Sequence, residues 1–449
     1  MTAATARPTS THVLRENRDF ALLWSGQAAS SLGSSMTGVA LPLLVLGITG
    51  SASSAGAVAF TGMLALLLAR LPAGVLADRV DRRNAMIVCD LGRGLMVAGI
   101  GIACLLDAVS MVQIYAAVAV AGLCTAVDGA AAVGSLARVV PREQMSVAMT
   151  RSQLRDQTVG LCGPPVGGVL FGLARAFPFL TDAVSYLVSA VATRLIRTDL
   201  SVAPRSHAGM LSEIREAAGW LARQRTLRLL LSWSVVANFA INGVVIGAIL
   251  VAREGGASAS LIGVMNALAA VGGVIGALAA SRLVPRLTAR QALTATGLAW
   301  AALFATMSLT DSPYLLGALL LLTIVVAPTS AVMVNTAVVV DTPDEMRSRV
   351  SSVTGLVASC ANPLGPLLMG VLLDAIGRST MLVFGAVVAV GSLLFLVRSA
   401  GVFAPAGDAG PADGPQRADG DDGERGGEPC GEADVRADRP AEEQPVHQP

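Results

Sequence analysis

Ionisable side chains inside long apolar runs are the residues of this sequence most able to do chemistry. A charge near the middle of a membrane is costly, so such residues are functional candidates by default. The set comprises Arg70, Asp90, Arg93, Asp128, Arg155, Asp156 and Asp182. A carboxylate in a partly dry cavity can take up and release a proton near neutral pH, which makes Asp128 and Asp156 the proton-coupling candidates. Alternatively, both are permanently paired with Arg151 or Arg155.

The remaining charges are interpreted chiefly as a structural brace. Asp90 and Arg93 are three residues apart on one helix face and can form an ion pair. Arg70 lies at a similar depth on the preceding run and could join them. Arg155 points about 100° away from the next residue along the helix, so it could pair with Asp128 instead. Asp182 lies near an outer end, where water can reach it, and carries little weight.

Several chemistries are excluded by residue types that are absent or misplaced. The 32 basic residues are all Arg, so neither a phosphate-binding GxxxxGK[ST] loop nor a Schiff-base lysine can exist. The three histidines lie outside the apolar runs, and no two of the six cysteines are spaced as CxxC. We therefore expect no metal, no cofactor and no enzymatic activity. A net charge of +1 gives no indication of nucleic-acid binding.

The elements that must position these charges are transmembrane helices. The chain has 53% hydrophobic and 14% charged residues, with a mean hydropathy of +0.65. This composition, with apolar runs of about 20 residues, predicts an all-α integral membrane protein. The predicted spans are 20–48, 53–77, 84–106, 111–137, 146–172, 177–197, 228–252, 258–282, 290–309, 313–340, 350–374 and 379–398.

Arginine placement predicts how these twelve spans are oriented. With the N-terminus in the cytoplasm, nearly all loop arginines are cytoplasmic, and only Arg175, Arg253 and Arg378 lie outside. Both termini would then be cytoplasmic. The predicted parts are an N-terminal segment (1–19), a six-helix bundle (20–197), a central loop with an amphipathic helix (198–227), a second six-helix bundle (228–400) and a disordered tail (401–449). The apolar face of the amphipathic helix is Ile214, Ala217, Ala218 and Leu221.

The chain also repeats itself at a shift of 202 residues. Gly163-Pro164 corresponds to Gly365-Pro366, for example, and Pro141 corresponds to Pro343. A shift that covers six spans predicts two parallel six-helix repeats. Such repeats are typical of secondary transporters, whose binding site lies between the halves near the bilayer midplane. The first half holds the buried charges, whereas no Asp, Glu or Arg lies deep in the spans of the second.

Three stretches of sequence carry a resemblance to a known family. The stretch from Gly74 to Arg83, GVLADRVDRR, resembles the signature G-x-L-A-D-R-x-G-R-R of the major facilitator superfamily, with Asp81 in place of Gly. GPPVGG and TDAVSYLVSA resemble its drug and siderophore exporter branch, which includes enterobactin exporters and macrolide efflux proteins. The resemblance implies a twelve-helix fold and a loop that latches the cytoplasmic side. The gating residues would be Gly74, Asp78, Arg79, Arg82 and Arg83.

Small residues on the fifth span form a second candidate element. They are Gly160, Gly163, Pro164, Gly167 and Gly168, and they resemble the antiporter signature of drug exporters. Their helical spacing would also suit close helix packing, and this alternative stays open. In the second half, neutral side chains could line a cavity for a large, weakly polar substrate or could only join helices. These candidates are Asn238, Phe239, Asn242, Met265 and Asn266.

The function expected from these features is export of a drug, natural product or siderophore by proton antiport. The two halves would rock to give alternating access. The expected partners are the small-molecule substrate, protons and the lipid bilayer of the cell membrane, with the protein as a monomer. One alternative is uptake or facilitated diffusion. Another is a membrane sensor or scaffold that transports nothing.

Overall fold

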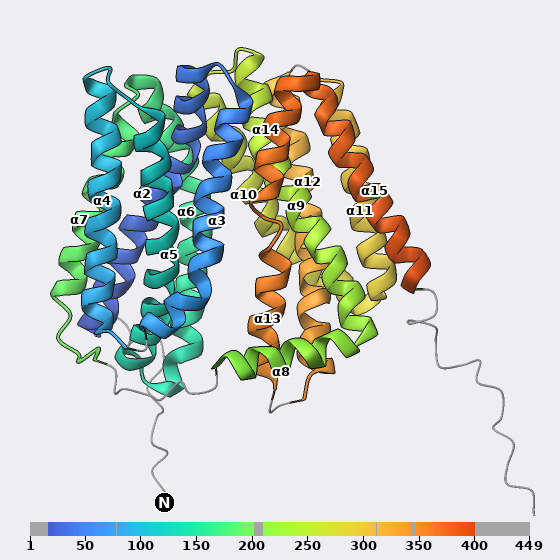
Figure 1. The fold of residues 1–449 in the computed structure, drawn as a ribbon, viewed down its shortest axis with the longest axis horizontal. Coiled ribbons are helices and arrows are strands. Elements are labelled where there is room, and N and C mark those ends of the chain that lie inside the picture. Colours follow the sequence, from blue (N-terminus) through green and yellow to red (C-terminus); the bar gives the residue numbers. More distant parts are fainter. Residues whose placement is uncertain (1–16, 78, 202–209, 311, 344–345, 400–449) are drawn as a thin grey trace, which may run out of the picture. The chain divides into compact units, whose positions relative to one another are not determined.

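The computed structural model describes residues 17–77, 79–201, 210–310, 312–343 and 346–399, and in these ranges every regular element is a helix (Figure 1). The predicted N-terminal segment (1–19) therefore lies outside the described residues except for its last three, and the predicted tail (401–449) lies outside them entirely. The first group of helices comprises α2 (Arg18–Thr49), α3 (Ala52–Ala77), α4 (Arg82–Leu105), α5 (Met111–Val139), α6 (Met145–Leu173) and α7 (Phe177–Arg194).

A second group of helices follows the amphipathic helix α8 (Met210–Arg223). It comprises α9 (Arg225–Glu254), α10 (Ala259–Leu283), α11 (Ala289–Ser308), α12 (Pro313–Asp341), α13 (Arg347–Ser359), α14 (Leu364–Ile376) and α15 (Thr380–Ser399). The predicted span 350–374 is thus two helices, separated at residues 360–363. Pro363 explains the break, because it has no N–H to donate and its ring clashes with the preceding turn.

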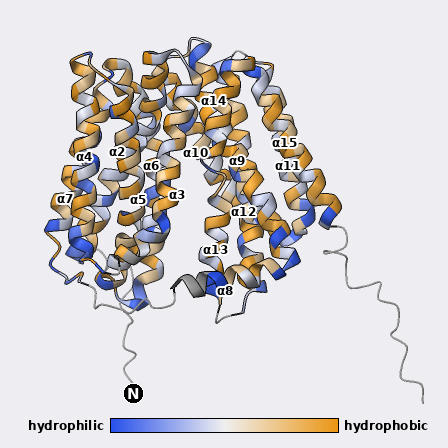
Figure 2. Ribbon diagram, viewed as in Figure 1, coloured by the Kyte–Doolittle hydropathy of each residue, from blue (hydrophilic) through white to orange (hydrophobic). Residues whose placement is uncertain are grey.

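Eight stretches of the described residues are long and apolar enough to cross a membrane. The helices α6, α7 and α11 fall outside this set, and residues 349–399 count as one stretch although α14 and α15 run in opposite directions (Figure 1). Figure 2 shows hydrophobic residues along most of the helix lengths and hydrophilic residues gathered at the end of the bundle where α8 lies. The distribution is that of a protein embedded in a bilayer.

The two groups have the same pattern of neighbours. In the first, α2 packs on α6 and α7, α3 on α5, and α4 on α5 and α7. In the second, α9 packs on α14 and α15, α10 on α12, and α11 on α12 and α15. The matching neighbours agree with the repeat predicted at a shift of 202 residues.

The two groups meet through glycine-mediated contacts at the end of the bundle opposite α8. A Cβ on Gly168 of α6 would collide with the carbonyl oxygen of Ala259, the first residue of α10. A Cβ on Gly370 of α14 would collide in the same way with Ala52, the first residue of α3. The two glycines correspond in the repeat, so each half contributes an equivalent close helix contact.

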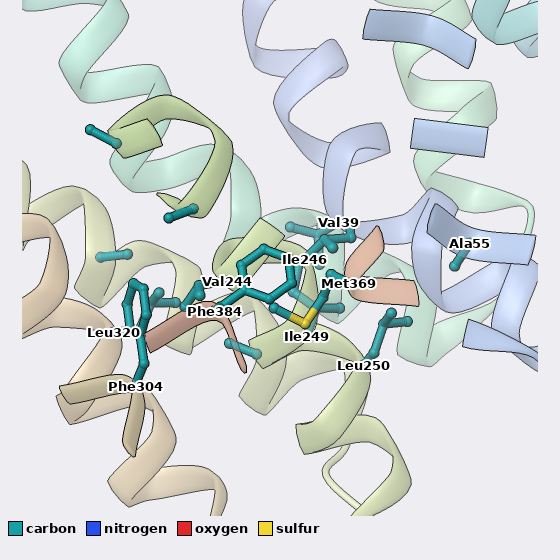
Figure 3. Close-up of a cluster of buried hydrophobic side chains, with 14 of the residues drawn as sticks. Val39, Ala55, Val244, Ile246, Ile249, Leu250, Phe304, Leu320, Met369 and Phe384 are labelled. Atoms are coloured by element: carbon teal, nitrogen blue, oxygen red, sulfur yellow. The ribbon is translucent and has the colours of Figure 1, made fainter. Parts of the chain in front are cut away.

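The core of the second group extends to this contact region. Phe304 and Phe384 are fully buried, and the ring of Phe239 stacks on Phe384 with 5.0 Å between centroids. Figure 3 shows Phe384 and Met369 beside Ile246 and Ile249 of α9, with Val39 of α2 nearby. Aromatic and aliphatic side chains thus form one continuous buried cluster across both groups.

The helix α8 attaches to the second group at its own end of the bundle. Ala217 and Leu221 are buried, whereas Ala218 is exposed because it points about 100° away from its neighbour. The predicted apolar face is therefore correct for Ala217 and Leu221 and wrong for Ala218, while the side chain of Ile214 lies outside the described residues. Glu216 approaches Arg349 of α13 at 3.5 Å.

Candidate functional site

A buried charge triad lies inside the first group of helices. The Arg93 guanidinium donates to Asp90 at 2.7 Å, one turn away on α4, and to Asp128 of α5 at 3.0 Å. It also lies 4.7 Å from the ring centroid of Tyr186 on α7, which adds a cation–π contact. Asp90 and Arg93 are only 1% and 5% exposed. The predicted pairing of Asp90 with Arg93 is present.

The charges of this triad do not balance. Two carboxylates share one guanidinium, so the triad carries a net negative charge when both are ionised. In a low-dielectric interior an uncompensated charge is costly, and one proton would remove it. Asp90 Oδ2 and Arg93 Nε are also buried without a hydrogen-bond partner. The arrangement can therefore hold a proton, and the Asp128 side chain, 20% exposed, is its most accessible member.

Two separate hydrogen bonds join α2 and α7 near the triad. Tyr186 Oη and Ser34 Oγ are 2.8 Å apart, and Thr37 Oγ1 donates to Asp182 at 2.7 Å. Asp182 is 1% exposed, so its predicted position in a wet outer region is wrong. The reason is the close approach of α2, where Gly33 leaves no room for a Cβ beside Asp182.

Asp128 and Asp156 both line a polar cavity of about 840 Å³. Arg155 forms an ion pair with Asp156 at 2.9 Å and donates to Gln27 of α2 at 2.6 Å. The sequence suggested that Arg155 could pair with Asp128. In the structure it does not, because Arg93 forms an ion pair with that carboxylate. The Asp156 side chain is 52% exposed, which leaves it far better hydrated than the triad.

Arg70 does not join the charge cluster. Its guanidinium donates to Ser359 of α13 at 3.0 Å and is exposed. The prediction that Arg70 pairs with Asp90 and Arg93 is therefore wrong in this structure. Its side chain faces the second group of helices, and the guanidinium stays hydrated there.

A central cavity of about 450 Å³ lies between the two groups of helices. Its lining comes from α2, α3, α6, α9, α10 and α14, and is mostly apolar. Asn242 and Asn266 line it, and each amide donates to a carbonyl of its own helix, at 2.8 and 3.0 Å. Their carbonyl oxygens stay available to accept a hydrogen bond from a ligand.

Three predicted cavity residues do not line this cavity. Asn238 donates to Ser234 of its own helix at 2.9 Å. Phe239 stacks on Phe384, and Met265 is 1% exposed, packed against Gly317. Helix packing accounts for all three positions.

A third cavity, of about 310 Å³, has lining residues in common with the other two. It shares Ser34 and Thr125 with the polar cavity, and Gly38 and Leu41 with the central one. Asp182 also lines it. Shared lining residues therefore place this cavity next to the polar cavity, which Arg93 and Asp128 line, and next to the central cavity.

The predicted gating loop connects α3 to α4. Asp78 lies outside the described residues, and Arg79 is exposed. Asp81, which replaces the glycine of the family pattern, caps α4 by accepting from the backbone N–H of Arg83 at 2.8 Å. Gly74 has nothing within 4 Å of an ideal Cβ, so none of the described helices packs closely against it in this conformation.

The loop arginines contact neighbouring elements of their own half. Arg82 donates to the carbonyl oxygen of Gly134 on α5 at 3.1 Å. Arg83 donates to the carbonyl oxygen of Thr198, after α7, at 2.8 Å. These bonds anchor the start of α4 within the first group, and the gating role of the loop stays a prediction.

The small residues of α6 bring two helices close to it. A Cβ on Gly163 or Gly167 would collide with Ser35 or Met36 of α2, whereas Gly168 faces α10. Gly160 is less constrained, with Ala270 4.0 Å from its ideal Cβ. Pro164 lines the central cavity. Close packing is therefore present, and the antiporter role stays a prediction.

We expect Gly168→Ala to destabilise the protein by about 1–3 kcal/mol, because the new methyl group meets the backbone of α10. Gly172→Ala on the same helix is the matched control, since its Cβ would lie 3.5 Å from Ser260 Oγ, an ordinary contact. Both changes raise helix propensity equally. Thermal unfolding in detergent measures the difference, and equal midpoints would contradict the packing argument.

One residue that the sequence did not single out joins the two halves. The carboxylate of Asp374, near the end of α14, accepts from Ser51 Oγ at 2.7 Å and from the backbone N–H groups of Ala52 and Ser53 at 2.8 Å each. It therefore caps α3 from the other half, at the end of the bundle opposite α8. The sequence alone did not indicate this role, because an Asp in the last turn of a predicted span is equally expected to be in contact with water.

Two groups of helices with matching neighbours, a central cavity between them and a buried ionisable network in one of them define a membrane transporter. The model of the family described as "Transmembrane secretion effector" matches residues 9–409, and the chain belongs to this family of the major facilitator superfamily. The resemblance to a drug exporter of this superfamily, drawn from its motifs, is thereby confirmed.

Relatives and solved structures agree with this assignment. The chain is 29% identical over 362 residues to the multidrug efflux pump Tap of Mycolicibacterium fortuitum, covering 77% of this chain and 87% of that protein. It is 26% identical over 376 residues to Tap of Mycobacterium tuberculosis (strain ATCC 25618 / H37Rv), covering 80% and 87%.

Two solved structures share the fold. A bacterial homologue of the human lysosomal transporter Spinster, in an inward-facing and unoccupied conformation, has a TM-score of 0.70 at 14% identity, covering 88% of this chain and 98% of that one. A bacterial homologue of the iron transporter ferroportin, in an inward-facing state, has a TM-score of 0.65 at 18% identity, covering 85% and 99%.

Proposed function

We propose that this transporter exports small organic molecules, such as drugs, natural products or siderophores, in exchange for protons. The observation that carries the proposal is the triad in which Asp90 and Asp128 share the single guanidinium of Arg93, because this network changes its net charge when one proton binds. The apolar central cavity with its two amides suits a weakly polar substrate. The relatives named as multidrug efflux pumps support the direction of transport.

The proposed topology has twelve membrane passes, with α13 and α14 forming one interrupted pass. Arginines at helix ends and loops support a cytoplasmic α8 side, since only Arg175, Arg253 and Arg378 lie at the opposite end in the described residues. Both termini would then be cytoplasmic, in the cell membrane. The repeat needs no second chain to complete the central cavity, so we propose a monomer.

The proposed conformation is inward-open. The close contacts of Gly168 with α10, of Gly370 with α3 and of Asp374 with the start of α3 all lie opposite α8. The halves would rock about this region to give alternating access, and the gating loop would close the α8 side in the other state. Two solved structures with this fold are described as inward-facing.

The triad can couple a proton to this movement through Arg93. A proton on Asp128 removes the charge that attracts the guanidinium, which then bonds more fully to Asp90. Arg93 also contacts Tyr186, which is hydrogen-bonded to Ser34 of α2. A change in the position of the guanidinium would therefore reach the wall of the third cavity, which shares lining residues with the central one.

Everted membrane vesicles with an acidified lumen test the proposal. A panel of antibiotics, siderophores and dyes is added, and collapse of the pH gradient is followed for the wild type, Asp128→Asn and Asp156→Asn. We expect at least a tenfold loss of substrate-induced proton movement in Asp128→Asn, because the triad can no longer change charge at that position. Asp156→Asn should keep most of the activity, since its carboxylate is half exposed.

Other outcomes would favour other functions. Equal activity of the wild type and Asp128→Asn would overturn the role of the triad in coupling. Substrate movement without any proton movement would indicate a facilitative permease, and movement only in the opposite sense would indicate uptake. An inserted, folded protein that moves no compound, and whose signalling depends on residues 401–449, would indicate a sensor or scaffold.

A further inference from the structure

A small cavity with three arginines lies where α9 begins and α15 ends. Its volume is about 420 Å³. Arg225 and Arg228 come from the first turn of α9, and Arg398 comes from the last turn of α15. Leu229 and Ser232 complete the lining, which holds no carboxylate. Two helix ends far apart in the sequence thus bring three cations around one space.

No carboxylate among the residues that the structure describes balances the positive charge of this cavity. Within the ranges that the structure describes, none of the three guanidinium groups forms an ion pair or a hydrogen bond. The helix end adds to the charge, because Gln224 at the start of α9 provides no side-chain cap for the first N–H groups. An anion is the ligand that such a site recognises, and arginine forks match the oxygens of a phosphate.

The surroundings of the cavity indicate that this phosphate belongs to a lipid. Along α15, directly before Arg398, large apolar side chains are exposed; Val390, Leu393, Leu394 and Val397 are 56%, 49%, 50% and 72% exposed. These side chains face the acyl-chain region in a membrane-embedded transporter. A ligand with a phosphate at the helix ends and apolar chains along α15 satisfies both parts of this surface.

We propose that Arg225, Arg228 and Arg398 form a binding site for the headgroup phosphate of an anionic phospholipid in the leaflet on the α8 side. Basic cavities between membrane helices bind anionic headgroups in this way, and phosphatidylglycerol has the required charge. The site lies at the periphery of the second group of helices and is separate from the transported substrate. It is independent of the proton-coupling proposal.

Native mass spectrometry of the detergent-purified protein, titrated with phosphatidylglycerol or phosphatidylcholine, tests the site. We expect phosphatidylglycerol to bind more tightly to the wild type. In the triple variant Arg225→Gln/Arg228→Gln/Arg398→Gln its affinity should fall on the order of 100-fold, because each arginine near an anionic headgroup contributes several-fold. The preference over phosphatidylcholine should disappear together with the affinity.

A matched triple variant separates the site from net charge. Arg215→Gln/Arg282→Gln/Arg286→Gln removes three exposed arginines from the same end of the bundle without touching the cavity, and it should bind phosphatidylglycerol like the wild type. An equal loss in both triples, or no preference for phosphatidylglycerol, would overturn the proposal. Full competition by millimolar inorganic phosphate would also overturn it, since the acyl chains would then contribute nothing. Size-exclusion elution and circular dichroism verify that both triples fold.

Discussion

Replacing Arg93 with Gln should destabilise the protein by about 3–5 kcal/mol, the usual consequence of removing one partner from a buried ion pair. Asp90 and Asp128 would be left near each other without the guanidinium that both contact, and Asp90 is only 1% exposed. The cation–π contact with Tyr186 would be lost as well. Thermal unfolding in detergent, followed at several pH values, measures the effect.

A second substitution separates charge from packing. In Asp90→Asn/Arg93→Gln the most buried carboxylate is neutral, so we expect recovery of at least half of the lost stability. Glu216→Gln is the control, because its pair with Arg349 is largely exposed and such pairs contribute about 1 kcal/mol or less. If Arg93→Gln were as mild as the control, the triad would not be the buried, charge-dependent element described above.

Removing the Asp374 carboxylate should open the end of the bundle opposite α8. The carboxylate accepts three hydrogen bonds across the two halves, and hydrogen bonds to a charged group contribute about 1.5–3 kcal/mol. Asp374→Ala should therefore increase the population of the state open on that side by roughly tenfold or more.

Labelling of a single cysteine measures this shift. Gly38→Cys, in a background without native cysteines, places a thiol in the central cavity, where a Cβ meets nothing within 4 Å. A membrane-impermeant maleimide applied from outside intact cells should react faster when Asp374→Ala is present. Glu254→Ala is the matched control, because this exposed acidic residue lies at the same end without a hydrogen bond between the halves. Equal rates in both variants would show that Asp374 does not hold the halves together.

The sequence predicted well those features that depend on local spacing. The pair Asp90–Arg93 follows from a three-residue separation on one helix, and the eight stretches that are long and apolar enough to cross a membrane all overlap predicted spans. The repeat predicted at a shift of 202 residues also appears in the packing, because Gly168 and Gly370 make equivalent close contacts in the two halves.

Features that depend on neighbouring helices were not predictable in this way. Nothing in the spacing shows that Arg93 also reaches Asp128 on α5, since that requires the distance between two helices. Asp182 looked hydrated because its position along the span is shallow, whereas its burial results from Gly33 on α2. Arg70 looked like a partner for Asp90 at equal depth, but depth does not determine which way a helix face points.

The interruption between α13 and α14 affects how a change at one end of the bundle is transmitted to the other end. The lower segment, α13, contacts α8 through Arg349 and Glu216, while the upper segment, α14, holds the other half through Asp374. A continuous helix would behave as a rigid lever and pass any displacement from one membrane face to the other. The break at Pro363 divides that lever, so in the proposed alternating-access mechanism we expect a substitution at one end of the bundle to leave the contacts at the other end intact.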